Sequence, residues 1–166
     1  MQLRLIEDEY TKMNIRLEIK HDKSLDEWIA NNHYLKCTPD GARVRMAFYD
    51  ISNTLVGAMM WGRPNARRLN QDKILELTRM YFIDNTPQFI ESHCLGLARK
   101  YIRKNMNQIK GLLSYSSQGE GHEGTIYEAD GWFQLGVMDS KSASWETRDG
   151  RRDRDNSNKI RWVRSP

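Results

Sequence analysis

Hydrophobic and polar residues alternate along much of the chain, and this period of two is typical of β-strands. In residues 14–20, for example, Ile15, Leu17 and Ile19 alternate with polar neighbours, which indicates a half-buried strand. Residues 73–83 carry apolar groups on both sides of the alternation, as expected of a central strand. The strands predicted in this way cover residues 14–20, 44–49, 54–61, 73–83, 109–115, 132–137 and 160–163, with a further short piece near Trp145.

Other stretches carry the signals of helix starts. Ser24, with Glu27 three residues later, matches a capping box, and Thr86 followed by Pro87 matches an N-cap with proline in the first turn. The helices expected from these signals cover residues 24–32, 86–102 and 124–129. The resulting order β-α-β-β-β-α-β-α-β predicts an α/β fold with a mixed sheet flanked by helices.

The length of 166 residues is enough for one domain with a real core. The longest uncharged apolar run, residues 55–62, is far shorter than the roughly 18 residues of a membrane span. The N-terminus lacks the pattern of a signal peptide, so we expect a cytoplasmic protein with no membrane segment. Cys37 and Cys94 lack the spacing of a zinc site, and we expect both to be small buried residues.

The excess positive charge lies at the C-terminal end. Residues 148–166 contain seven Lys and Arg against three Asp, a balance of +4 that equals the net charge of the whole chain. A basic segment beside a neutral body suits a polyanion, and a solvated, self-paired tail is the alternative. We therefore divide the chain into a catalytic domain over 1–147 and a basic segment over 148–166.

Serine, glycine and histidine gather where the strand at 109–115 leads into the helix at 124–129. Glycines such as Gly121 and Gly124 let the backbone approach a ligand closely, and His122 can act as a base, a metal ligand or a donor to an anion. The alternative is that residues 119–124 form only a turn, with His122 capping the helix.

Two further positions carry candidate chemistry. The adjacent imidazole and phenol of His33 and Tyr34 can bind iron or hold a flat heterocycle, although His33 could equally cap a helix. Arg79 interrupts the central strand, where a charge must be paired or face a site. Glu76 lies three positions away, so we expect it on the opposite face of the strand from Arg79.

Several short motifs occur in order over residues 30–136. They are His33-Tyr34-Leu35 with Thr38-Pro39, Leu55–Ala58 leading to Gly62-Arg63-Pro64, Ala66–Leu69, Leu75–Arg79, and Gly121–Ala129 with Trp132. Together they closely resemble the phage Mom family of DNA-modification proteins.

The resemblance implies a GNAT-like acyltransferase fold with a mostly antiparallel central sheet. It also implies conversion of adenine in double-stranded DNA to N6-carbamoylmethyladenine, which protects phage DNA from host restriction. The location would then be the cytoplasm of the phage's host, the partner is DNA, and a homodimer is a further expectation. The basic segment 148–166 would complete the sheet or contact DNA.

A flipped-out adenine is expected to enter a pocket between His33-Tyr34, Tyr49, Arg79 and the loop from residue 114 to 122. In this hypothesis Tyr34 or Tyr49 stacks on the base or bonds to it, and Arg79 holds an anionic part of the donor. Ser114 and Ser116 orient the donor, and Asp139 is an acidic member placed near the end of the sheet. The resemblance marks His33 and Tyr34 as active-site residues and as candidate ligands of an iron ion. Substrate contacts are expected from Arg63, Arg67 and Arg68, which belong to an exposed basic loop predicted over residues 62–72, and from Gly121, Gly124, Tyr127, Arg151 and Arg152.

The chain departs from the GNAT pattern at one place. GNAT enzymes grip the pyrophosphate of acetyl-CoA with a glycine-rich turn between the central strand and the long helix. Residues 83–88 occupy that place, contain no glycine and include the acid Asp84. The donor is therefore acetyl-CoA in another pose or another small two-carbon molecule. Two other functions stay open, an N-acetyltransferase for a protein or small-molecule amine and a non-catalytic DNA-binding phage protein.

Overall fold

The computed structural model describes residues 13–33, 36–117, 124–138 and 158–166. The helices and strands are β1 (Arg16–Lys20), α2 (Ser24–Asn32), β2 (Ala42–Tyr49), β3 (Leu55–Gly62), β4 (Ile74–Phe82), α3 (Ile90–Asn105), β5 (Gly111–Ser117), α4 (Thr125–Ala129), β6 (Phe133–Met138) and β7 (Lys159–Arg164). They follow the predicted order β-α-β-β-β-α-β-α-β, with the strand expected at residues 160–163 as a second strand, β7, after β6. The expected strand near Trp145 lies outside the described residues.

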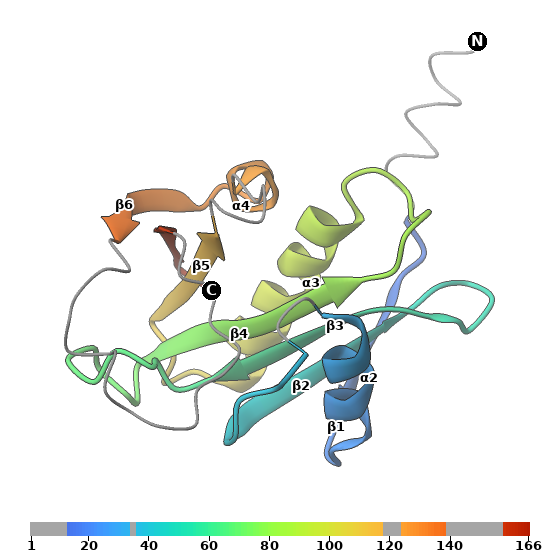
Figure 1. Cartoon of the computed structure of the whole chain (residues 1–166), viewed down its shortest axis with the longest axis horizontal. Coiled ribbons are helices and arrows are strands. Elements are labelled where there is room, and N and C mark those ends of the chain that lie inside the picture. Colours follow the sequence, from blue (N-terminus) through green and yellow to red (C-terminus); the bar gives the residue numbers. More distant parts are fainter. Residues whose placement is uncertain (1–12, 34–35, 118–123, 139–157) are drawn as a thin grey trace, which may run out of the picture.

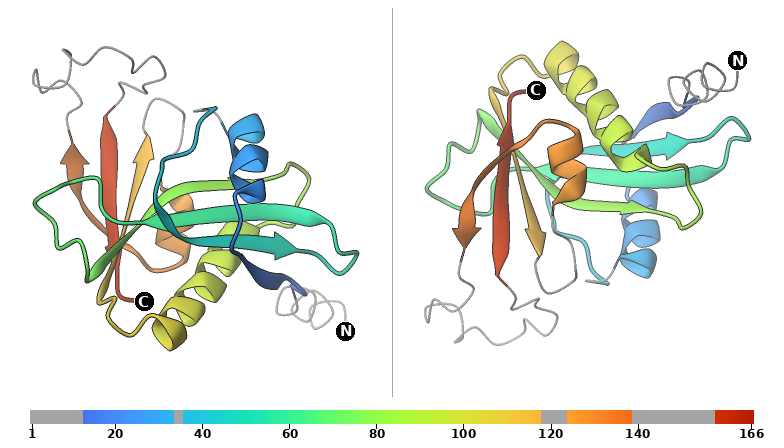
Figure 2. Two further views of the ribbon diagram at one scale, coloured as in Figure 1. Left: turned by 90° about the horizontal axis from the view of Figure 1, so that it is seen from below. Right: turned by 90° about the horizontal axis from the view of Figure 1, so that it is seen from above.

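The strands form one mixed sheet in the order β1-β2-β3-β4-β5-β7-β6. Only the β4–β5 pair is parallel among the described pairings, and the others are antiparallel. This arrangement confirms the predicted α/β class and its mostly antiparallel sheet. β4 and β5 diverge from the end at which they pair (Figure 1), and β5, β7 and β6 run steeply across the direction of β2, β3 and β4 (Figure 2).

Helices cover both faces of the sheet, with α2 on one face and α3 on the other (Figure 2). Under α2, Leu25 and Ile29 pack on small or flexible side chains of β2 and β3, including Ala47, Ala58 and Met60. Under α3, a larger core contains the buried indole rings of Trp61, Trp132 and Trp162. The buried residues of α3 follow the helical spacing that the sequence showed. They are Ile90, Cys94, Leu95, Ala98 and Ile102.

Both predicted helix caps are wrong. The Ser24 hydroxyl bonds to Asp22, and no side chain caps α2. The long helix begins at Ile90 rather than near Thr86, because Phe89 adopts a left-handed conformation with φ 67° that interrupts helical geometry. Thr86 instead donates its hydroxyl to the Ile83 carbonyl at 3.4 Å.

The basic C-terminal segment contributes β7, which lies between β5 and β6 rather than at the edge of the sheet. Trp162 of β7 is 1% exposed and stacks on Tyr127 of α4 at 5.8 Å between ring centroids. This strand therefore contributes to the main core. Within the described residues, no helix is long and apolar enough to span a membrane.

Candidate active site at the split between strands β4 and β5

The parallel strands β4 and β5 pair over only three positions and then separate. Residues 74–76 pair with residues 111–113. Beyond this point β4 pairs only with β3, and β5 pairs only with β7, in the described part of the sheet. The backbone groups that face the split are thus left out of the sheet ladder, and they can bind an extended ligand.

Arg79 lies on β4 beside this split and holds the segment that follows α2. Its Nε donates to the Cys37 carbonyl at 3.0 Å, and its Nη1 donates to the Thr78 carbonyl at 2.7 Å. The structure therefore brings Arg79 close to the chain that follows His33, as the expected pocket required. Cys37 is exposed, contrary to expectation, because the segment linking α2 to β2 lies outside both cores; Cys94 is buried as predicted.

The expectation that Glu76 and Arg79 face opposite sides of β4 is wrong. Between Leu77 and Arg79 the register with β3 shifts, so Thr78 is an extra residue and forms a β-bulge. The extra residue reverses the alternation of side chains, and it places Glu76 and Arg79 on the same face. The charge of Arg79 accordingly acts on the Glu76 carboxyl and opposes the rise in its pKa that burial causes.

Glu76 is the buried acid of this region, at 5% exposure. Burial raises the pKa of its carboxyl, although the backbone N–H of Asn65, at 2.8 Å from Oε2, and the charges of Arg79 and Arg161 oppose that rise. A buried carboxyl with a raised pKa beside an opening in the sheet is a candidate general base. Sequence reasoning missed Glu76, although the signal that selected Arg79, a charge within a buried strand, applied to it equally.

Ser114 and Ser116 lie on the face of β5 that α4 covers. Ser114 Oγ bonds to Tyr127 Oη at 2.7 Å, and Ser116 Oγ accepts from Trp162 Nε1 at 2.9 Å. Both serines are nearly fully buried, at 1% and 4% exposure. In this structure they tie β5 to α4 and β7, and their role in orienting a donor stays a prediction.

The other described candidates lie in different places. Tyr49 is at the far end of β2, under the cations of Arg16 and Lys20, and the structure does not bring it near Arg79. Gly124 precedes α4 with φ 81°, and an added Cβ would lie 2.1 Å from the Trp162 ring. Glycine is therefore required there by packing and by backbone conformation.

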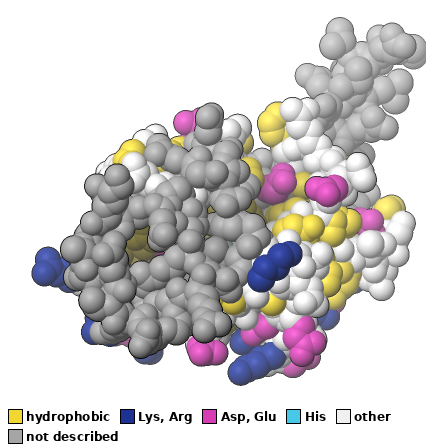
Figure 3. Space-filling view, in the orientation of Figure 1, with side chains coloured by type: hydrophobic (Ala, Val, Ile, Leu, Met, Phe, Trp, Pro, Cys, Tyr) yellow, Lys and Arg dark blue, Asp and Glu magenta, His cyan; other side chains and the backbone are white. Residues whose placement is uncertain are grey.

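Arg63, Arg67 and Arg68 are exposed on the loop between β3 and β4, as predicted for a basic loop. Arg63 also lines a pocket at the end of β3. In the face shown in Figure 3, acidic and basic side chains of the described residues are interspersed rather than gathered into one basic patch.

Several predicted site residues lie outside the described residues. They are Tyr34, Gly121, His122, Asp139, Arg151 and Arg152. His33 itself is buried at the end of α2, where its N–H donates to the Ile29 carbonyl at 2.7 Å. Among the described residues, no group of three or more His, Cys, Asp or Glu is placed to hold a metal, so iron at His33 and Tyr34 stays a prediction.

The turn between β4 and α3 differs from a pyrophosphate grip in structure as well as in sequence. Pro87 has no N–H, and the N–H of Ile90 is directed to the Pro87 carbonyl at 3.3 Å. Asp84 adds an exposed carboxylate where phosphate charge would lie. The residues of this turn therefore do not fit CoA in the usual GNAT pose.

Comparison with known proteins agrees with this geometry. The fold resembles spermidine N-acetyltransferase from Vibrio cholerae in complex with CoA and spermine, with a TM-score of 0.66, 13% identity, and coverage of 93% of this chain and 96% of that one. It also resembles an acetyltransferase of the GNAT family from Streptococcus pneumoniae, with a TM-score of 0.61, 8% identity, and coverage of 92% and 99%. The fold is therefore that of the GNAT acetyltransferases.

In sequence, the chain is similar to the methylcarbamoylase Mom of Escherichia phage Mu, with 27% identity over 120 residues and 68% of this chain. That match covers 49% of the phage Mu protein, so the chain spans about half the length of this relative. The model of the Mom protein family matches residues 14–164, which include every described strand and helix. The chain belongs to the Mom protein family.

Proposed function

We propose that this protein is a transferase that converts adenine in double-stranded DNA to N6-carbamoylmethyladenine and so protects phage DNA from restriction. The observation that carries the proposal is the family match over residues 14–164, together with the similarity to the phage Mu methylcarbamoylase. The split between β4 and β5, with Glu76 and Arg79 on one face, supplies the chemistry that such a transfer needs.

The amino nitrogen of adenine must lose a proton as it forms a bond to the CH2 carbon of the carbamoylmethyl group, while the bond from that carbon to the donor's leaving group breaks and the leaving group keeps the electron pair. Glu76 is placed to take that proton, because its carboxyl is buried and its raised pKa makes it a stronger base than an exposed glutamate. Arg79 and Arg161 supply positive charge that keeps the carboxylate available. The target base must leave the duplex stack to reach this carboxylate, at a cost of a few kcal/mol.

The donor is the least constrained part of the proposal. A neighbour in fold binds CoA, and the split shared by this fold supports an acyl-CoA or another small two-carbon donor. Because the turn at residues 83–88 does not fit the pyrophosphate, we assign no step of the reaction to CoA.

Restriction digestion tests the proposal. DNA from cells that express the wild-type chain is expected to resist an enzyme whose recognition site contains adenine, and DNA from cells with Glu76→Gln is expected to be cut. An enzyme whose site contains only G and C provides the control and should cut both DNAs equally. Full cutting of both DNAs by the first enzyme, with both proteins soluble and folded, would reject the proposal.

A second candidate function is N-acetylation of a protein or a small-molecule amine. The fold favours it, because the similar solved structures include a spermidine N-acetyltransferase. The turn at residues 83–88 argues against it, since this function needs the usual grip on acetyl-CoA. Calorimetry with acetyl-CoA separates the two, because only this second function requires binding that is independent of DNA.

A homodimer also stays a prediction. Strand β6 forms one edge of the sheet and exposes three large apolar side chains, Phe133, Leu135 and Val137. One fold neighbour, a spermidine N-acetyltransferase, forms a dodecamer. Sedimentation equilibrium of the purified chain measures its oligomeric state directly.

A further inference from the structure

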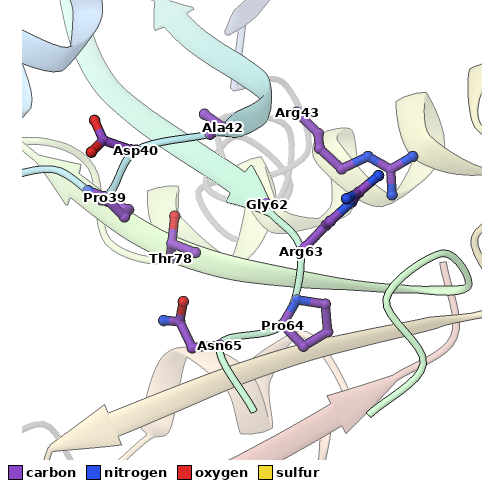
Figure 4. Close-up of a pocket in the computed structure, with 10 residues that line it drawn as sticks. Pro39, Asp40, Ala42, Arg43, Gly62, Arg63, Pro64, Asn65 and Thr78 are labelled. Atoms are coloured by element: carbon purple, nitrogen blue, oxygen red, sulfur yellow. The ribbon is translucent and has the colours of Figure 1, made fainter. Parts of the chain in front are cut away.

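A pocket of about 470 Å³ opens where the start of β2 meets the end of β3. Its walls are residues 39–43, residues 62–65 and Thr78 of β4. Figure 4 shows the guanidinium groups of Arg43 and Arg63 together on one side and the side chains of Asp40, Asn65 and Thr78 on the other. A pocket of this size can hold a nucleotide or a similarly sized polar molecule.

Two of the residues that line this pocket, Arg43 and Thr78, lie at β-bulges. Arg43 is the extra residue of a register shift between Ala42 and Val44 on β2, and Thr78 is the extra residue of the shift on β4. The two bulges flank the last residues of β3 from either side. Bulges recur beside functional sites because they redirect a side chain, and here both bulged residues line the same pocket.

On the cationic side of the pocket, the arginines have no counter-charge among the described residues. Arg43 Nη1 is buried and has no hydrogen-bond partner within the described residues. Neither Arg43 nor Arg63 forms an ion pair in that part of the chain, although the two guanidinium groups line one pocket. Two adjacent guanidinium groups, on the side of the pocket away from the Asp40 carboxylate, favour an anion, and together they match the oxygens of a phosphate.

The opposite side of the pocket has the chemistry of a base reader. Asparagine can bond to an adenine edge through both its amide groups, and the Asp40 carboxylate can accept from an exocyclic amino group. Pro39, beside Asp40, and Pro64, beside Arg63, add apolar surface to the lining of the pocket (Figure 4). The pocket thus has a phosphate end and a base end.

The end of the pocket that would hold the nucleobase also adjoins Glu76, the candidate general base. The backbone N–H of Asn65 donates to Glu76, and Thr78 immediately precedes Arg79. We propose that this pocket receives one nucleotide of the DNA strand, with its phosphate at Arg43 and Arg63 and its base edge at Asp40 and Asn65. This inference rests on the proposed function, since it supplies the place where the acceptor adenine would lie.

Binding of short single-stranded oligodeoxyadenylate to the full chain tests the phosphate end. The salt dependence of the affinity counts the phosphate contacts, so Arg63→Gln and Arg43→Gln should each weaken binding and lower the slope of log affinity against log salt by about one. Lys100→Gln, on the exposed surface of α3, removes the same charge outside the pocket and should leave the slope unchanged. Arg63 is exposed, so its variant should fold even if Arg43→Gln does not.

The base end is tested with a matched oligonucleotide that carries one abasic position. The wild-type chain should prefer the intact adenine strand, and Asn65→Ala should lose that preference without a change in the salt slope. Equal slopes for Arg63→Gln, Lys100→Gln and the wild type would overturn the inference, as would an unchanged preference in Asn65→Ala.

The test is separate from that of the reaction. If Arg63→Gln lowers the slope of log affinity against log salt while the wild-type chain leaves DNA unmodified, the result would support the pocket and reject the proposed function. Full DNA modification by cells that express Asn65→Ala or Arg63→Gln would reject the pocket and leave the function standing.

Discussion

Replacement of Asp130 by alanine should destabilise the protein more than any surface substitution. Its carboxylate is 8% exposed and accepts from Arg99 Nε at 2.8 Å, Arg99 Nη2 at 2.7 Å and Trp132 Nε1 at 2.8 Å. These bonds join α3 to the turn between α4 and β6, and so they hold the elements beside the split.

The magnitude follows from what Asp130→Ala leaves behind. Removing one member of a buried ion pair typically costs about 3–5 kcal/mol, because the remaining charge is left buried without a partner. The Arg99 side chain is 14% exposed, so water partly compensates its charge and the lower part of that range applies. The loss of about 3 kcal/mol in a domain of this size corresponds to a fall in Tm of roughly 6–12 °C.

Urea denaturation followed by circular dichroism measures this loss, and a double-mutant cycle with Arg99→Ala isolates the ion pair. Arg99→Ala alone should cost less than Asp130→Ala, because the Trp132 bond survives it. The double variant should be only slightly less stable than Asp130→Ala. A loss below about 1 kcal/mol for Asp130→Ala, the range of exposed pairs, would show that the Asp130–Arg99 pair does not act as a buried ion pair.

Three other predictions concern the site and the core. Burial raises the folded-state pKa of Glu76 above its usual 4.5, so the stabilising effect of its protonated form is complete below pH 4.5 and is lost as pH rises through the folded-state pKa. The free energy of unfolding of Glu76→Gln, measured across pH, should lack that decline. The modification activity of the wild type should rise with pH over the same window. Gly124→Ala should unfold several degrees below wild type in a thermal melt, because its Cβ would meet the β7 indole ring. At Gly41 the backbone φ is 77° but an added Cβ would lie in open space, so Gly41→Ala should lose only about 1–2 kcal/mol of stability. Equal losses in the two variants would show that packing is not the cause. A thiol reagent should label the exposed Cys37 in the native protein and Cys94 only on unfolding, and rapid native labelling of both would contradict the buried position of Cys94.

The strands were predictable because the chain alternates apolar and polar residues wherever one face of the sheet is buried. Residues 14–20 and 44–49 therefore coincide closely with β1 and β2. The helix at residue 90 was misplaced because Thr86 and Pro87 carry the local signals of a helix start, whereas the left-handed Phe89 is set by the surrounding structure.

The candidate site was only partly predictable. Arg79 and Arg63 were selected from the sequence as charges in a strand and in a basic loop. Glu76 carried the same signal as Arg79, a charge within a buried strand, and was passed over because it was expected on the other face of the strand. Arg43 was missed because its position depends on a β-bulge, and a one-residue shift of register leaves no pattern that sequence periodicity can detect. The insertion of β7 between β5 and β6 likewise depends on pairing between distant segments.

Mass spectrometry of nucleosides, from DNA of cells that express the wild-type chain, shows whether this chain modifies the amino nitrogen of adenine in DNA. A deoxyadenosine heavier by one carbamoylmethyl group is expected, and it should be absent when Glu76→Gln or His33→Ala replaces the wild type. Unmodified nucleosides from cells with abundant, folded wild-type protein would contradict the proposed function.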